Sequence, residues 1–155
     1  MKNYILCFDL SLSNTGIAVF DDSGVCIELL SIGTEKEKTH PLKLRKIEQT
    51  MLSLKKKYNP QEIIIEESFT RFNKSTQAIF KVRGITELIF WDIPQTCYHA
   101  TSVRKEVLGK GNLKKEHLRN YILENYSDIT FEDYDQSDAF GLGLCHFKKI
   151  GVLQQ

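Results

Sequence analysis

Four acidic residues stand where a fold could bring them together: Asp9, Glu66, Asp135 and Asp138. Asp9 ends the apolar run YILCF, and Glu66 follows three consecutive isoleucines at 63–65. Asp135 and Asp138 are three residues apart, so on a helix they would share one face. Clustered carboxylates repel one another and raise each other's pKa unless a cation neutralises them. The pattern therefore predicts a site for divalent metal ions.

Oxygen ligands alone favour Mg²⁺, with Mn²⁺ as a substitute, over zinc. Two such ions, about 3.5–4 Å apart, activate water and stabilise the leaving oxygen in phosphodiester hydrolysis. We therefore interpret the four acids as both catalytic residues and ligands of two ions. Plainer explanations remain open: Asp9 as a turn residue, Glu66 as a solvated strand end, and Asp135 as a helix cap or first-turn acid. Asp138, which is followed by an apolar run, has no such ready explanation.

The apolar patterns predict the elements that would position these acids. Strands are expected at residues 4–10, 15–20, 25–32, 62–69 and 96–100. Helices are expected at residues 41–57, 76–91, 102–108 and 113–126, and from about 135 onward. The first three strands are joined by short turns and form an antiparallel meander. The fourth follows a crossover helix and should lie parallel to the first.

The predicted fold is thus α/β, a five-stranded mixed sheet flanked by helices, with residues 1–155 forming one domain. The ends of the two parallel strands meet at one edge of the sheet, the edge where open α/β sheets bind ligands. We expect Asp9 and Glu66 to meet there. The final helix would bring Asp135 and Asp138 to the same edge.

The charge distribution favours a polyanionic partner. The net charge is only +1, but the chain divides into segments of opposite sign. Residues 1–68 carry 9 Lys/Arg and 10 Asp/Glu, residues 69–119 carry 10 and 4, and residues 120–155 carry 2 and 6. A basic middle beside acidic ends suits a polyanion held next to a carboxylate cluster. Lysines that simply coat helix surfaces would explain the charges equally well.

The remaining composition predicts a cytoplasmic protein that does not enter membranes. The sequence has 4 cysteines, too widely spaced for a zinc knuckle, and each lies among apolar residues as buried free thiols do. This usage is typical of a reducing compartment. No apolar run approaches the ~20 residues of a membrane helix. The N-terminus runs directly into a strand pattern and has no signal-peptide features.

The order of these motifs resembles the RuvC family of Holliday-junction resolvases, within the ribonuclease H-like nuclease superfamily. The resemblance covers nearly the whole chain and rests on the segments FDLSLSNTG, IIIEESF, VLGKGNLKKEHL and DQSDAFGLGL. It implies a ribonuclease H-like fold and a metal-dependent endodeoxyribonuclease that cleaves Holliday junctions or other branched DNA. The family's four acids match Asp9, Glu66, Asp135 and Asp138.

The resemblance also implies DNA-binding residues. Phe69 matches an aromatic residue that stacks in the opened junction. Arg104 and Lys115 match basic positions that contact DNA, and Lys110 and Lys114 belong to the same stretch. Independently of the family, the polar segment SFTRFNKST sets Phe69 and Phe72 beside Arg71 and Lys74. Aromatic rings among basic residues suit stacking on unpaired bases and contacts to phosphates.

Two-strand cleavage of a four-way junction by one site per chain predicts a homodimer. The helix at 76–91 has more apolar surface than one sheet face needs, so part of it should meet a second copy; a wholly internal helix is the alternative. Departures from the family pattern, Leu10-Ser11 after the first acid and Glu67 after the second, indicate a divergent, phage-type member.

Three other functions compete with a junction resolvase. One is a ribonuclease H-like enzyme on RNA–DNA hybrids, or a broad flap and branch endonuclease. Another is a non-catalytic branched-DNA-binding module, which would be expected to lose acids that this chain keeps. The third is an actin-like ATPase or sugar kinase, which has a similar strand pair but needs a second phosphate loop that 155 residues do not accommodate.

Overall fold

The computed structural model describes residues 1–67 and 74–154. Its strands are β1 (Tyr4–Asp9), β2 (Asn14–Asp21), β3 (Cys26–Gly33), β4 (Glu62–Glu67) and β5 (Gln95–His99). Its helices are α1 (His40–Tyr58), α2 (Lys74–Ile89), α3 (Ala100–Leu108), α4 (Lys115–Asn125) and α5 (Tyr134–Lys149).

The five strands form one mixed sheet in the order β3-β2-β1-β4-β5. β1 pairs antiparallel with β2, and β2 with β3, whereas β4 lies parallel to both β1 and β5. The predicted meander and the predicted parallel return are therefore confirmed. In this register Asp9 is opposite Gly16, and Phe8 is opposite Ile65. Asp9 and Glu66 consequently end neighbouring strands at the same edge.

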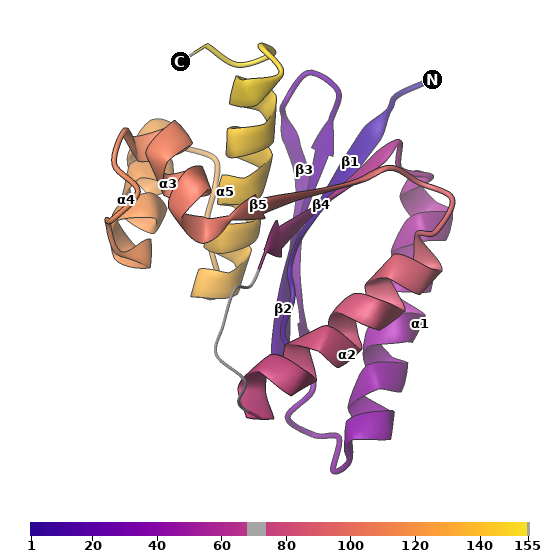
Figure 1. Ribbon diagram of the computed structural model, residues 1–155. Coiled ribbons are helices and arrows are strands. Elements are labelled where there is room, and N and C mark those ends of the chain that lie inside the picture. Colours follow the sequence, from indigo (N-terminus) through magenta and orange to yellow (C-terminus); the bar gives the residue numbers. More distant parts are fainter. Residues whose placement is uncertain (68–73, 155) are drawn as a thin grey trace.

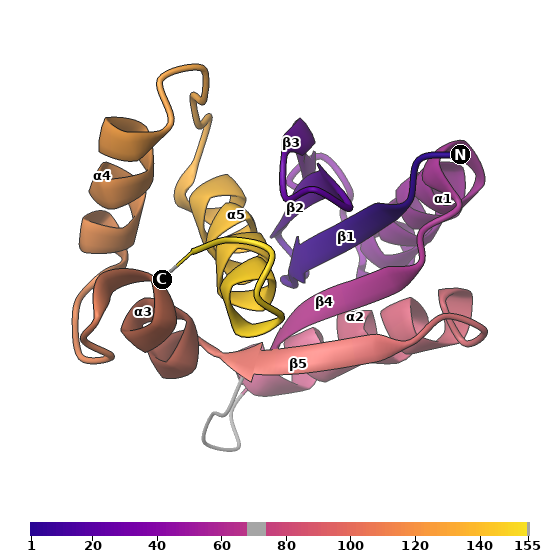
Figure 2. The ribbon, with the colours of Figure 1, turned by 90° about the horizontal axis from the view of Figure 1, so that it is seen from above.

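Helices cover both faces of the sheet. In Figure 1, α1 and α2 lie on one side and α5 on the other, with α3 and α4 stacked outside α5. Figure 2 shows the same layers from above, with the strands fanned between them. A hydrophobic core lies on each face of the sheet, and alternate residues of β1 pack into one or the other. Leu6 and Phe8 face α1 and α2, whereas Ile5 and Cys7 face α5. Burial on both faces explains why the strand reads as a continuous apolar run.

Capping hydrogen bonds and local backbone conformation determine where helices begin and end. Thr39 caps α1 by accepting a hydrogen bond from the backbone N–H of Leu42, and Asn59 ends it in a left-handed conformation. α5 is capped by Asp133, whose side chain accepts from the N–H of Gln136. Asp135 is therefore not the N-cap, but it is a first-turn acid, the other possibility that the sequence left open. α2 begins at Lys74, two residues before the predicted start.

Two of the predicted buried thiols are buried, Cys7 and Cys145, whereas Cys26 and Cys97 are partly exposed because they lie on the outer strands β3 and β5. All four are free. Within residues 1–67 and 74–154, no helix combines the length and apolar character needed to cross a bilayer.

Candidate metal centre

Three elements bring the four predicted acids together. Asp9 ends β1, Glu66 lies near the end of β4, and Asp135 and Asp138 lie in the first turns of α5. Carboxylate oxygens of Asp9, Asp135 and Asp138 lie within 4.8 Å of one another. Glu66 lies outside this group of three, but it is near enough for its charge to raise the pKa of Asp9. The structure thus gathers residues separated by more than a hundred positions into one cluster.

The close approach of α5 to β2 holds this arrangement. Gly16, opposite Asp9 in the sheet, leaves the space that the backbone of Asp135 occupies. Beside it, Asn14 donates hydrogen bonds to both Asp133 and Asp135. The first turn of α5 is therefore fixed against the strand pair that carries Asp9.

The cluster is electrostatically unfavourable without a cation. Asp9 is only 9% exposed, and burial, followed by the charge of Glu66, raises its pKa well above the usual value. Burial and the same neighbour raise the pKa of Asp138 to about 7. Burial also raises the pKa of Glu66, although contact with Asp9 and the charges of Arg104 and Lys115 oppose this shift.

These acids fit a divalent cation. The converging atoms are carboxylate oxygens, the ligands that Mg²⁺ and Mn²⁺ prefer, and the described residues supply no sulfur or imidazole ligand to the cluster. A bound cation would offset the repulsion that raises the carboxyl pKa values. These carboxylates could therefore hold a metal ion at an edge of the sheet that a polyanion can approach.

A basic rim adjoins the acids. Glu66 and Asp138 line a hollow of about 430 Å³ together with a third acid, Glu116, and the three basic residues Arg104, Lys114 and Lys115. The charges of Arg104 and Lys115 oppose the rise in the pKa of Glu66 and of Asp138, as cations near carboxylates do. The hollow, called the basic groove below, therefore presents positive charge beside the metal ligands.

Two other predicted DNA-binding residues, Lys110 and Lys74, are not part of this groove. Lys110 is exposed after the end of α3 and does not line it. Lys74, at the start of α2, lines a different hollow with His40 and Lys81. Phe69 and Arg71 lie outside the described residues.

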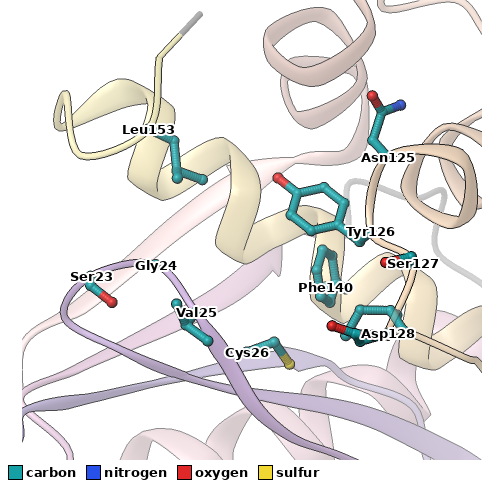
Figure 3. Close-up of a pocket in the computed structure, with 11 residues that line it drawn as sticks. Ser23, Gly24, Val25, Cys26, Asn125, Tyr126, Ser127, Asp128, Phe140 and Leu153 are labelled. Atoms are coloured by element: carbon teal, nitrogen blue, oxygen red, sulfur yellow. The ribbon is translucent and has the colours of Figure 1, made fainter.

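A second cavity, of about 470 Å³, lies away from this chemistry. Figure 3 shows it between the β2–β3 turn, the end of α4 and the segment after α5. Val25, Tyr126, Phe140 and Leu153 supply much of its lining, and Asp128 is its one acidic residue. The β2–β3 turn is at the opposite end of β2 from Gly16, so this cavity is remote from Asp9. It lacks the clustered ligands of a metal centre.

Sequence reasoning missed three contributors to the site: Asn14, Asp133 and the packing role of Gly16. Asn14 and Asp133 are 119 residues apart, so no local pattern links them. Asp133 had a recognisable signal, because Asp before a helical apolar pattern is a common N-cap. Gly16 is also part of the segment FDLSLSNTG, but nothing in that segment indicates which backbone packs against it.

The whole chain is similar to known proteins. The family model described as "Crossover junction endodeoxyribonuclease RuvC" matches residues 5–146. A protein of that name from Ehrlichia ruminantium (strain Gardel) is 33% identical, with 94% of this chain and 97% of the relative covered. One from Bacteroides fragilis is 29% identical, over 97% of this chain and 85% of the relative.

The fold also matches that of a solved structure. The solved structure of Thermus thermophilus RuvC in complex with a Holliday junction substrate matches with a TM-score of 0.82, 16% identity and 97% coverage of both chains. At that identity the likeness establishes the ribonuclease H-like fold. The match of the family model over residues 5–146, with a relative 33% identical over nearly its whole length, shows that this chain belongs to the RuvC family of crossover junction endodeoxyribonucleases.

Proposed function

We propose that the protein is a metal-dependent endodeoxyribonuclease that resolves Holliday junctions by hydrolysing phosphodiester bonds. One observation carries the proposal: the carboxylates of Asp9, Asp135 and Asp138 converge at a sheet edge, and Glu66 lines the basic groove directly beside them. Membership of the RuvC family supports the same activity. A non-catalytic DNA-binding module would have no need to keep four mutually repelling, largely buried acids.

In this proposal Asp9, Glu66, Asp135 and Asp138 hold two Mg²⁺ ions, with Mn²⁺ as a substitute. The bound metal would supply activation of water and stabilisation of the leaving oxygen. The protein's own contribution is rigidity, because the ligands project from two paired strands and a helix packed on them. Arg104, exposed to the same groove, offers a planar guanidinium for a phosphate.

The basic groove is proposed to hold the DNA backbone at the metal site. Lys114 and Lys115 begin α4, and Arg104 lies on α3, so the positive charge comes from two adjacent helices. Lys74, Lys110, Phe69 and Arg71 remain sequence-based candidates for further DNA contacts. A cytoplasmic location likewise remains a prediction from cysteine usage.

We further propose a homodimer formed through α2. Three large apolar side chains are exposed on the outer face of this region: Phe80 at 53%, Leu88 at 72% and Trp91 at 77%. Gly84 lies at helical spacing between Phe80 and Leu88, and a side chain there would meet no atom within 4 Å. A mid-helix glycine costs about 1 kcal/mol relative to alanine. Close crossing of a second helix at Gly84 would explain both the glycine and the exposed apolar residues.

The activity is tested by incubating the protein and Mg²⁺ with synthetic substrates of one sequence: a four-way junction, a flap, an RNA–DNA hybrid and a linear duplex. We expect symmetric paired nicks in the junction and little cleavage of linear duplex. Preferential cleavage of the hybrid would instead support a ribonuclease H activity, and binding of the junction without any cleavage would support a non-catalytic module.

A further inference from the structure

We propose that Asn14 is a positioning residue that fixes the orientation of the Asp135 carboxylate for metal binding. The inference rests on the proposed function, because it concerns the same metal centre. Asn14 is the first residue of β2, and its Nδ2 donates to Asp135 Oδ2 at 2.7 Å. The contact joins residues 121 positions apart, across the junction of β2 and α5.

Asn14 is itself held in place. Its Nδ2 also donates to Asp133 Oδ2 at 3.0 Å, and the Ser31 hydroxyl donates to that same oxygen at 2.7 Å. The other oxygen of Asp133 accepts from the backbone N–H of Gln136 at 2.8 Å, which caps α5. The amide of Asn14 is thus tied to an acceptor that is fixed by two other groups. Its direction toward Asp135 is determined by the fold.

The contact has a defined chemical effect. A carboxylate in the first turn of a helix can rotate about its side-chain torsions, and a hydrogen bond to Oδ2 restricts that rotation. Asn14 is neutral, so it orients Asp135 without neutralising the charge that a cation needs. A lysine or arginine in its place would form an ion pair and compete with the metal. Hydrogen bonds that orient metal ligands are worth about 10–100-fold in metal affinity or activity.

A purely structural role for Asn14 makes a different prediction. In that case Asn14 would act only through Asp133, by joining the cap of α5 to the sheet. Ser31 offers the matched comparison, because it donates to Asp133 and has no contact with Asp135 among the described hydrogen bonds. Ser31→Ala therefore loosens the same cap while leaving the Asn14–Asp135 contact in place.

The test is a Mn²⁺ titration of the full chain without DNA, in which the electron paramagnetic resonance signal reports free Mn²⁺. We expect Asn14→Ala to raise the Mn²⁺ dissociation constant about 10–100-fold, and Ser31→Ala to leave it near the wild-type value. In cleavage assays, Asn14→Ala should raise the Mg²⁺ concentration for half-maximal rate, and junction affinity in Ca²⁺ should not change.

A second variant, Asn14→Leu, keeps the side-chain volume but has no hydrogen-bond donor, and it serves if the alanine variant does not fold. We expect Asn14→Leu to weaken Mn²⁺ binding to the same extent. Unchanged Mn²⁺ affinity in either folded variant would overturn the proposal. The proposal would also be overturned if Ser31→Ala weakened Mn²⁺ binding as much as the Asn14 variants do, or if neither Asn14 variant folded. Either result would mean that Asn14 acts only through the cap of α5. The Mn²⁺ titration contains no DNA, so it tests the role of Asn14 separately from the nuclease activity. If Mn²⁺ binding depends on Asn14 but the protein does not cut junctions, only the proposed nuclease function is contradicted.

Discussion

Gly16 lies directly against the backbone of Asp135, so closely that a methyl group added to Gly16 would overlap the Asp135 carbonyl and lie 2.8 Å from the backbone nitrogen of Gln136. Gly16 is also the sheet partner of Asp9. One glycine therefore sets how closely α5, which carries Asp135 and Asp138, approaches the strand paired with Asp9. This contact makes the packing of the fold and the geometry of the metal centre inseparable.

Gly16→Ala should displace the first turn of α5. We expect the free energy of unfolding to fall by about 1–3 kcal/mol, as for other overpacked sites, and junction cleavage to fall about 100-fold, because a shift of ~1 Å is enough for that loss. Gly33→Ala is the control, since the methyl group there would meet side chains and no backbone: it would overlap the flexible carboxylate of Glu35 and lie in ordinary contact, at 3.7 Å, with Asn14 Oδ1. Chemical denaturation and cleavage rates measure both effects. Wild-type cleavage by Gly16→Ala would show that the helix can move without consequence.

Asp138→Asn should stabilise the metal-free protein while it disables the enzyme. Burial, followed by the charge of Glu66, raises the pKa of Asp138 to about 7, so its ionised form is unfavourable in the folded state. In EDTA at pH 8, we expect the variant to melt at a higher temperature than wild type. Added Mg²⁺ should stabilise wild type more than the variant. A variant that melts lower in EDTA would contradict mutual repulsion within the cluster.

The basic groove should contribute salt-dependent binding. Lys115→Ala should weaken junction binding and reduce the slope of log K against log salt by about 0.9, the value expected for one lost phosphate contact. Lys56→Ala is the control, because Lys56 is exposed on α1, across the sheet from the groove. Fluorescence anisotropy at several salt concentrations measures the slope. Equal slopes for wild type and Lys115→Ala would remove Lys115 from the DNA contacts.

The α2 dimer predicts a specific sensitivity to charge. Leu88→Glu places a carboxylate on the exposed apolar face of α2 and should convert the dimer to a monomer in sedimentation at micromolar concentration. Leu52→Glu on α1, where the native side chain is 48% exposed, should leave the dimer intact. A wild-type protein that stays monomeric with and without junction DNA would refute the dimer.

A buried histidine predicts a pH dependence unrelated to the metal centre. His146 on α5 lies between Tyr98, whose hydroxyl is 3.0 Å from Nδ1, and Glu62, whose Oε2 is 3.2 Å from Nε2 but not aligned for a hydrogen bond. Burial lowers the pKa of His146, although Glu62 opposes the shift. The unfolded chain therefore binds the proton at higher pH than the folded one. His146 should therefore contribute a loss of stability as the pH drops below about 6.5, opposite in sign to the gain from the carboxyl groups with raised pKa values, and His146→Gln should remove that loss in thermal melts.

Much of the fold could be predicted because its signals are local. The isoleucines at 63–65 mark a strand buried on both faces, and the crossover rule fixes its direction relative to β1. The convergence of Asp9 and Glu66 follows from that topology alone. The excess apolar character of the helix also predicted an exposed face, which Phe80 and Leu88 of α2 provide.

The remaining parts of the site depend on contacts that no local pattern encodes. Asn14 meets Asp133 and Asp135 only because α5 packs on β2 in one particular register. The fit of Gly16 against Asp135 likewise depends on the final position of the helix. The basic groove could not be predicted because it depends on how α3 and α4 are placed relative to each other. The distribution of charge along the sequence does not specify that placement.

The most direct measurement of the central claim is cleavage of a synthetic four-way junction by Asp9→Asn at saturating Mg²⁺, beside wild type. The substitution keeps the shape of the side chain and removes one metal-binding charge at the centre of the cluster. We predict that the variant binds the junction as tightly as wild type or more tightly, because less negative charge faces the phosphates, and that it makes no cuts. Full cleavage by Asp9→Asn would contradict the assignment of these carboxylates as the metal centre.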